Sequence, residues 1–323
     1  MDHNLYLEKI EEVIQSINYP DYPSELYAPI RYTLSNAGKR FRPVASMLAC
    51  DLVNGDCNEA LYPAVSLELL HNFTLIHDDI MDQAPLRRGK ETVYRKWNTD
   101  IAILSGDTLF AMAYDFLIKT DPKMLPQILH AFNRIAIQIC EGQQMDMNFE
   151  DSYDVSIEEY IEMIRLKTAV FFGGCMQIGA IIGDASQQQI DLLYDYGEKL
   201  GIAFQLQDDI LDAFGSEKEV GKKKGGDIAT NKKTFLYLKA LEISDPETSG
   251  RLRHLFSVPA ASEAEKIEEV LGIFEKLKVR TYAEEMIEQY YEAALTVLEK
   301  VQANQHKKEV FRNFGMRLMK RNK

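Results

Sequence analysis

The stretch LIHDDIMDQAPLRRG, residues 75–89, places three aspartates within five residues of an apolar helical pattern, and two arginines follow it. On an α-helix, residues four apart lie on one face, so Asp78 and Asp82 point the same way and Asp79 is displaced to the side. Apolar neighbours deny these carboxylates a fully hydrated face, and uncompensated carboxylates in such surroundings take up protons. A divalent cation removes that cost, because magnesium binds one or two carboxylates together with waters and phosphate oxygens. A single motif of this kind is nevertheless more typical of a solvated acidic turn.

The same pattern recurs far along the chain. The segment FQLQDDILDAFG, residues 204–215, has Asp208, Asp209 and Asp212 in a second apolar helical context. Two such helices facing each other across a cavity would hold several metal ions, and those ions would hold a diphosphate. Because the motif occurs twice, chance is a poor explanation. The two segments together predict one site for metal ions and a diphosphate.

Helical periodicity extends over most of the chain. Apolar residues recur at three- and four-residue spacing, prolines fall between the periodic stretches, and alternating strand patterns are nearly absent. We therefore expect an all-α fold formed by a single domain over residues 1–323. The stretch GSEKEVGKKKGGDIATNKK (215–233) is the one long segment with the composition of a loop, and loops of that length are usually functional or disordered.

The composition argues against several classes of protein. A formal net charge of −13 would repel a nucleic-acid backbone, so no nucleic-acid partner is expected. The most apolar run, FFGGCMQIGAIIG (171–183), falls short of the roughly 20 apolar residues of a spanning helix; we interpret it as a buried core helix, and no membrane insertion is expected. The four cysteines form no CxxC pair and fit no zinc site, which favours a reduced, cytoplasmic setting.

Fixed positive charges accompany the acidic motifs. Lysine binds phosphate as a point charge and arginine binds it bidentately. Lys167 interrupts the apolar pattern of IRLKTAVFF, and AGKRFRP contributes Lys39, Arg40 and Arg42. Three other lysines are interpreted as exposed surface cations: Lys223, Lys224 and Lys233.

These motifs resemble the trans-isoprenyl diphosphate synthases, or polyprenyl synthetases, over nearly the whole chain. The matching segments are, in order, GKRFRP (38–43), DDIMD (78–82) followed by LRRG, GQQMD (142–146), KT (167–168), FQLQDDILD (204–212) and GKKKGGDIATNKKT (221–234). One departure is visible: the family often has two glycines before the Lys-Arg pair, and Ala37 takes the first place here.

The resemblance implies a bundle of about ten core helices around a deep central cavity, usually in a homodimer. It implies head-to-tail condensation of isopentenyl diphosphate with an allylic diphosphate (dimethylallyl, geranyl or farnesyl) and release of pyrophosphate. It also implies about three Mg²⁺ ions per active site, with Mn²⁺ able to substitute. The chemistry agrees, because ionisation of a carbon–oxygen bond needs a strongly stabilised leaving diphosphate, and the allylic cation must be kept from water. We expect the released pyrophosphate to take the final proton.

By the same resemblance, residues receive roles. Magnesium would be ligated by Asp78, Asp82 and Asp208, with Asp212 a further candidate ligand among the supporting aspartates Asp79, Asp209 and Asp212. The allylic diphosphate would meet those ions and four cations: Arg87, Lys167, Lys222 and Lys232. Isopentenyl diphosphate would be bound by Lys39, Arg42, His71 and Arg88. Oxygen dipoles directed at the carbocation would come from Thr168 and Gln205.

Product length is expected to depend on the residues just before the first motif. Phe73 and Thr74 lie about one turn, or about 5.4 Å, before Asp78 on the helix axis. A phenyl ring there would form the floor of the cavity within a few isoprene units, although Phe73 could equally be an ordinary core residue. An aromatic residue five positions before the motif resembles the short-chain members. Geranylgeranyl diphosphate is therefore the first expectation and farnesyl diphosphate the second.

Three other interpretations stay open at this stage. A class I terpene cyclase would share the fold and the first motif, but DDILD and GKRFRP argue against it. A metal-dependent phosphohydrolase would use His71 and His77 as metal ligands, but it would not explain the second motif. A non-catalytic subunit of a heteromeric synthase would tend to lose its aspartates, and this chain keeps all six.

Overall fold

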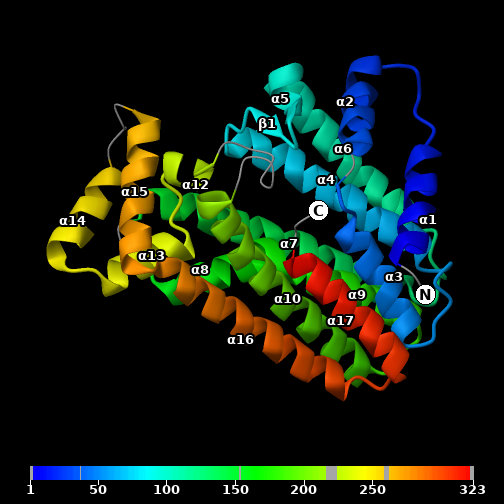
Figure 1. Ribbon diagram of the computed structural model, residues 1–323. Helices are drawn as coiled ribbons and strands as arrows, with labels where there is room; N and C mark the ends of the chain where they lie inside the picture. Colours follow the sequence, from blue (N-terminus) through cyan, green and yellow to red (C-terminus); the bar gives the residue numbers. More distant parts are fainter. Residues whose placement is uncertain (1–2, 37, 153, 216–223, 258–261, 321–323) are drawn as a thin grey trace.

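The computed structural model describes residues 3–36, 38–152, 154–215, 224–257 and 262–320 (Figure 1). The predicted all-α fold is confirmed. The N-terminal half contains α1 (His3–Gln15), α2 (Ser24–Ser35), α3 (Phe41–Leu52), α4 (Leu61–Met81), β1 (Leu86–Arg87), β2 (Lys90–Glu91), α5 (Val93–Lys96), α6 (Thr99–Leu117) and α7 (Leu125–Asp151). The C-terminal half contains α8 (Ile157–Ile164), the π-helix η1 (Arg165–Ala169), α9 (Val170–Ile182), α10 (Gln187–Phe214), α12 (Gly226–Ala229), α13 (Phe235–Ile243), α14 (Pro246–Leu255), α15 (Glu263–Leu277), α16 (Val279–Lys300) and α17 (Gln305–Met319).

The centre of the bundle is α9, the helix that the sequence predicted to be a buried core helix. It packs against α3, α7 and α10, and nearly all of its side chains are buried. A helix that is apolar on every side must be covered on every side, which explains its central place. None of the described helices combines the length and the apolar character of a membrane span.

The apolar side chains form two clusters. One joins α1, α2, α3, α4, α6, α7, α9, α17 and the second half of α16, and the other joins α8, α13, α14, α15 and the first half of α16. Helix α10 contributes to both, with Leu193 and Leu200 in the first and Leu206 and Ile210 in the second. In Figure 1, α13, α14 and α15 accordingly lie at one end of the molecule and α1 and α3 at the other. The single-domain organisation over residues 1–323 stays a prediction.

The π-helix η1 separates α8 from α9, and a glycine on each of two neighbouring helices, α7 and α10, packs against it. A Cβ on Gly142 of α7 would lie 2.3 Å from the Lys167 backbone nitrogen, and one on Gly201 of α10 would lie 2.5 Å from Ala169 Cα. Only glycine lets the two neighbouring helices approach η1 so closely. Single turns of π-helix are frequent at functional sites, and this one carries Lys167 and Thr168.

A short hairpin follows α4 and was not predicted from the sequence. Strands β1 and β2 pair antiparallel, and the turn between them uses Arg88 at φ 53° and Gly89 at φ 74°. Two-residue hairpin turns favour positive φ at both positions, which glycine adopts without strain. The hairpin places the two arginines of LRRG beside the end of α4.

Candidate active site

The first acidic segment ends α4. Asp78 and Asp82 are half-buried, whereas Asp79 is only 4 % exposed. Its Oδ1 accepts from Arg87 Nε at 2.8 Å and from Arg87 Nη2 at 2.7 Å. Burial raises the pKa of Asp78 and the like charge of Asp82 adds to this, while Lys167 opposes both. Asp79 therefore points to the side, as predicted, and orders the hairpin arginine.

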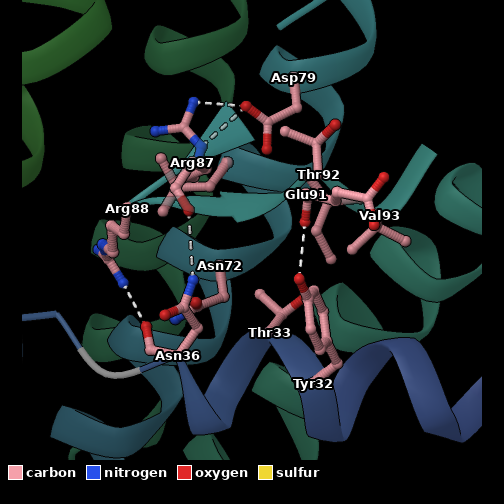
Figure 2. Close-up of a pocket in the computed structure, with 12 residues that line it drawn as sticks. Tyr32, Thr33, Asn36, Asn72, Asp79, Arg87, Arg88, Glu91, Thr92 and Val93 are labelled. Atoms are coloured by element: carbon pink, nitrogen blue, oxygen red, sulfur yellow. Dashed lines mark hydrogen bonds and ion pairs between the residues drawn. The ribbon is translucent and has the colours of Figure 1, made fainter. Parts of the chain in front are cut away.

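Figure 2 shows the surroundings of this pair. A pocket of about 30 Å³ lies between α2, α4 and the hairpin, lined among others by Tyr32, Asn72 and Thr92. Asp79 lines this pocket, but the four candidate metal ligands Asp78, Asp82, Asp208 and Asp212 do not, so the pocket is not the predicted metal site.

The second acidic segment ends α10, and its central carboxylate is again buried. Asp209 is 4 % exposed. Tyr160 of α8 donates a hydrogen bond from its hydroxyl to Asp209 Oδ2, and the Gln205 amide nitrogen lies 3.3 Å from Asp209 Oδ1. Burial raises the pKa of Asp209 well above its ordinary value, and Asp227 adds to this. Asp208 and Asp212 are half-buried, and Asp212 Oδ2 accepts the backbone N–H of Asp227 at 3.0 Å.

Lys232 joins the two segments. Its Nζ lies 3.1 Å from Asp82 Oδ1 and 3.4 Å from Asp146 Oδ2. Its backbone N–H donates to the carbonyl of Asp227 at 2.8 Å, and Asp227 in turn donates to Asp212. Burial lowers the pKa of Lys232, but Asp146 and Asp82 outweigh that effect and raise it overall. The structure thus brings Asp82 and Asp212 into one continuous set of contacts at the same end of the bundle.

Asp146, the last residue of the GQQMD segment, contacts two lysines, and its role was not predicted from the sequence. Its Oδ2 accepts from Lys167 Nζ at 2.5 Å and from Lys232 at 3.4 Å. Burial alone would raise the pKa of Asp146, but the two ammonium groups hold it below its ordinary value. The signal that could have identified it is the glycine four residues earlier, where α7 meets η1 and Lys167. Tyr160 and Asp227 were also missed, and their contacts join distant parts of the chain.

A second group of polar residues surrounds Arg42. Its guanidinium lies 5.0 Å from the Phe171 ring and 4.7 Å from the Phe172 ring. Arg42 Nη1 lies 3.2 Å from His71 Nε2. Since arginine can only donate, this nitrogen accepts, and the neutral ring carries its proton on Nδ1. Burial lowers the pKa of His71 well below its ordinary value, and the positive charge of Arg42 lowers it further.

Lys39 and Arg40 of the AGKRFRP segment and Arg88 of the hairpin differ in their surroundings. Arg88 Nη1 donates to the Asn36 carbonyl at 2.8 Å, and its guanidinium lies where a Cβ on Gly38 would stand, 2.5 Å from Nη2. Lys39 is exposed. Arg40 is fully buried and bonds to Glu11 at 2.8 Å and Glu68 at 2.6 Å. Arg40 is therefore part of the core, whereas Arg88 contacts the start of the segment that carries Lys39 and Arg42.

Thr168 and Gln205 contact each other directly, with Thr168 Oγ1 donating to Gln205 Oε1 at 3.0 Å. Lys222, Lys223 and Ala37 lie outside the described residues. The prediction that Lys233 is an exposed surface cation is wrong: its ammonium donates to the carbonyls of Phe149, Glu150 and Ser152 at the end of α7. Positive charge there satisfies carbonyls that the helix leaves unpaired. Lys224 is half-buried rather than exposed.

Phe73 belongs to a group of aromatic rings from three helices. Its ring centroid lies 5.0 Å from that of Phe110, and Phe110 lies 5.2 Å from Tyr114 and 6.4 Å from Phe132. Thr74 donates to the His71 carbonyl at 2.9 Å. These rings join α4, α6 and α7 about one turn before the first acidic segment, and Phe73 itself is half-buried.

The donor set fits magnesium that is shared with a ligand. Within the part of the chain that the structure describes, no three His, Cys, Asp or Glu side chains form a ready-made metal cluster. Mg²⁺ usually keeps several waters and combines one or two carboxylates with substrate phosphates, which is compatible with Asp78, Asp82, Asp208 and Asp212. His77 instead faces α6, 3.8 Å from Asp107, and His71 faces a guanidinium. Neither histidine is placed as the phosphohydrolase interpretation requires.

Comparison with known proteins gives a consistent result. The sequence model of a family described as Polyprenyl synthetase matches residues 23–274. A short chain isoprenyl diphosphate synthase of Methanothermobacter thermautotrophicus is 39% identical over 277 residues, which cover 85% of this chain and 83% of that protein. A geranylgeranyl pyrophosphate synthase of Geoglobus acetivorans is 39% identical over 295 residues, covering 90% and 88%.

Solved structures agree with the sequence relatives. A crystal structure of geranylgeranyl pyrophosphate synthase superposes with a TM-score of 0.95 at 39% identity and covers 100% of both chains. A polyprenyl synthase from Caulobacter crescentus CB15, complexed with calcium and isoprenyl diphosphate, superposes with a TM-score of 0.86 at 26% identity, covering 98% of this chain and 94% of that one.

Proposed function

This chain belongs to the polyprenyl synthetase family, and we propose on that premise that its two acidic segments bind one allylic diphosphate through shared Mg²⁺ ions. The chain is a trans-prenyltransferase. It condenses isopentenyl diphosphate with an allylic diphosphate and releases pyrophosphate. The observation that carries the proposed site is the bridge made by Lys232. Its ammonium contacts the first segment at Asp82, and its backbone N–H is bonded to Asp227 of α12, which contacts the second segment at Asp212.

The proposed metal ligands are Asp78, Asp82, Asp208 and Asp212. About three Mg²⁺ ions bound there would neutralise the diphosphate as its carbon–oxygen bond ionises, and Mn²⁺ could substitute. Lys167 and Lys232, both held by Asp146, add fixed positive charge at the same place without having to reorganise. Arg87 is oriented by Asp79 toward the same diphosphate, and Lys222 is proposed to join this set.

The proposed site for isopentenyl diphosphate is the group of Lys39, Arg42, His71 and Arg88. Arg42 is confined by the Phe171 and Phe172 rings and by His71, so its donors are pre-positioned for a phosphate group. The neutral His71 can donate from Nδ1 while Nε2 stays bound to Arg42. Thr168 and Gln205 are proposed to direct oxygen atoms at the allylic carbocation. The released pyrophosphate is proposed to take the final proton.

The proposed product is geranylgeranyl diphosphate, with farnesyl diphosphate as the second candidate. The support is the aromatic group around Phe73, which narrows the space between α4, α6 and α7. A homodimer is also proposed, because Leu104 of α6, Ile118 directly after α6 and Ile137 of α7 are 57%, 55% and 60% exposed, and large exposed apolar side chains favour association. A cytoplasmic location is part of the proposal, supported by the four free cysteines.

The experiment that tests the function is a product assay. The protein is incubated with Mg²⁺, labelled isopentenyl diphosphate and, in separate reactions, dimethylallyl, geranyl or farnesyl diphosphate, and the dephosphorylated products are sized. Elongated products that need both substrates and disappear with a chelator are expected. A terpene cyclase would convert the allylic diphosphate alone into a hydrocarbon, and a phosphohydrolase would release phosphate from either substrate alone. Either result would overturn the proposal.

A further inference from the structure

A buried chain of hydrogen bonds runs from α8 through α10 to η1. Tyr160 donates to Asp209 Oδ2, Gln205 Nε2 donates to Asp209 Oδ1 at 3.3 Å, and Thr168 donates to Gln205 Oε1 at 3.0 Å. Tyr160, Asp209 and Thr168 are 2%, 4% and 8% exposed. Water therefore has little access to Tyr160, Asp209 and Thr168, and the polar groups of these residues depend on one another and on Gln205 for hydrogen bonds.

The hydrogen bonds of this series all have a defined donor and acceptor. The Tyr160 hydroxyl and the Gln205 amide nitrogen both donate to Asp209, so the carboxylate is the acceptor for two neighbours. An amide whose nitrogen is held in this way must present its oxygen to the other side, and there it accepts from Thr168. The Thr168 proton is used in that bond, so the lone pairs of its hydroxyl oxygen remain available. The Asp209 carboxylate thus fixes the positions of two oxygen atoms, Gln205 Oε1 and Thr168 Oγ1.

We infer that Tyr160 and Asp209 are positioning residues that hold the Gln205 amide with its oxygen toward Thr168 and the reacting carbon. This inference rests on the proposed function, in which Gln205 and Thr168 face the allylic carbocation. If the amide rotated by half a turn, its NH₂ group would point toward that cation and would oppose the developing positive charge. Asp209 is therefore assigned to orientation of the amide rather than to the metal ions, although it lies next to Asp208 in the motif.

Tyr160→Phe removes the hydroxyl and leaves the ring packing of α8 intact. Without this donor, Gln205 is the one side-chain hydrogen-bond partner of Asp209 left among the described residues, and the amide loses its fixed orientation. We expect kcat to fall about tenfold, as for loss of a hydrogen bond to a charged group. The KM values of both substrates and the Mg²⁺ concentration for half-maximal rate should stay within about twofold, because no substrate or metal contact is removed. A residue that acted through the metal would instead shift the Mg²⁺ dependence.

The matched control is Tyr196→Phe. Tyr196 lies on α10, is fully buried and donates its hydroxyl to the Phe311 carbonyl at 3.1 Å, in the other apolar cluster. Its substitution removes a buried tyrosine hydroxyl of the same kind and should leave kcat within about twofold of the wild type. If both variants lost kcat equally, the effect would be general loosening of the bundle and the inference would be wrong.

A double-mutant cycle adds an independent test. Tyr160 and Gln205 donate to different oxygens of Asp209, and Asp209→Asn replaces one of these oxygens by an NH₂ group, so the two present hydrogen bonds cannot both be kept. We expect the single variants to lower kcat and the Tyr160→Phe/Asp209→Asn double variant to lose no more than Asp209→Asn alone, because both act through one amide. If the double variant loses kcat by the product of the two single losses, the positioning inference is wrong. The same holds if Tyr160→Phe keeps the wild-type kcat. In both cases a wild type that makes prenyl product leaves the proposed function intact. A wild type that makes no prenyl product overturns the proposed function and this inference with it.

Discussion

The two acidic segments share one five-residue pattern, yet their central aspartates have different partners. Asp79 and Asp209 are both 4% exposed. Asp79 binds the guanidinium of Arg87 in a hairpin, whereas Asp209 accepts from two neutral donors, Tyr160 and Gln205. The first and last aspartates of each motif stay half-buried, and the last ones, Asp82 and Asp212, belong to one set of contacts through Lys232 and Asp227. The repeated motif thus has similar surroundings at its ends and different partners at its two centres.

The largest loss of kcat is expected at the first aspartate of each motif, where the two segments are alike. Asp78→Ala and Asp208→Ala should each lower kcat by about a thousandfold or more, because each removes a proposed ligand of the ions that stabilise the leaving diphosphate. The measurement is product formation at saturating substrates and Mg²⁺. Asp191→Ala, at an exposed position on the same helix as Asp208, is the control and should keep full activity. If either variant kept a tenth of the wild-type rate, the two segments would not be equivalent.

The second largest loss of kcat is expected at Lys232, which links the two segments. Lys232→Met keeps an unbranched side chain without the terminal ammonium, and so removes the charge that contacts Asp82 and Asp146. We expect kcat to fall about a hundredfold, since a fixed cation aimed at the diphosphate is lost. Lys276→Met, at an exposed position on α15, should behave as the wild type. Normal turnover in Lys232→Met would mean that the bridge has no part in the reaction.

The difference between the two centres can be read from stability. Asp79→Asn leaves the Arg87 guanidinium without its carboxylate and should lower the free energy of unfolding by about 2 kcal/mol. Asp209→Asn leaves no unpaired charge and should cost less. Urea unfolding, followed by circular dichroism, measures both values under the same conditions. The comparison between the centres fails if Asp209→Asn is the more destabilising change.

One turn before each motif stands a phenylalanine, and the two should differ in effect. Phe73 meets Phe110 across α4 and α6, whereas Phe204 packs on Phe172 at 5.5 Å inside the core. Phe73→Ala should lengthen the product by at least about one isoprene unit, since it opens about a turn of space. Phe204→Ala, which creates a similar cavity elsewhere, should destabilise the protein without changing product length. An unchanged product profile in Phe73→Ala would assign Phe73 to the core alone.

The smallest effect is a pH dependence at His71. Its pKa is lowered in the folded protein, so below its ordinary value of about 6.5 the unfolded chain binds a proton that the folded chain does not. The stability that His71 contributes is therefore complete above that pH and is lost as the pH falls. Between pH 6.5 and 5.5, His71→Gln should show a slope of unfolding free energy smaller by about 1 kcal/mol per pH unit. The control is His306→Gln at an exposed position, which should keep the wild-type slope; a wild-type slope in His71→Gln would contradict the neutral ring.

The sequence predicted those features of the site that depend on the spacing of residues along one helix. Positions four apart on a helix share a face, so the common direction of Asp78 and Asp82 and the displacement of Asp79 followed from spacing alone. Arg40 and Arg42 could not be separated in this way, because one meets Glu11 and Glu68 in the core and the other meets two aromatic rings. Lys233 looked like a surface lysine because its partners are backbone carbonyls, which no residue pattern marks.

The sequence by itself determined that the chain is helical, that carboxylates gather on two apolar helix ends, and that lysines and arginines stand near them in the chain. These features depend on helical periodicity and on residue chemistry, which act over a few positions. Only the tertiary structure decided that Asp146 holds Lys167 and Lys232 together and that Tyr160 lies on Asp209 rather than on any other acceptor. Such pairs form where backbones meet, here at Gly142 and Gly201 beside the π-helix, and the packing of whole helices sets those meeting points.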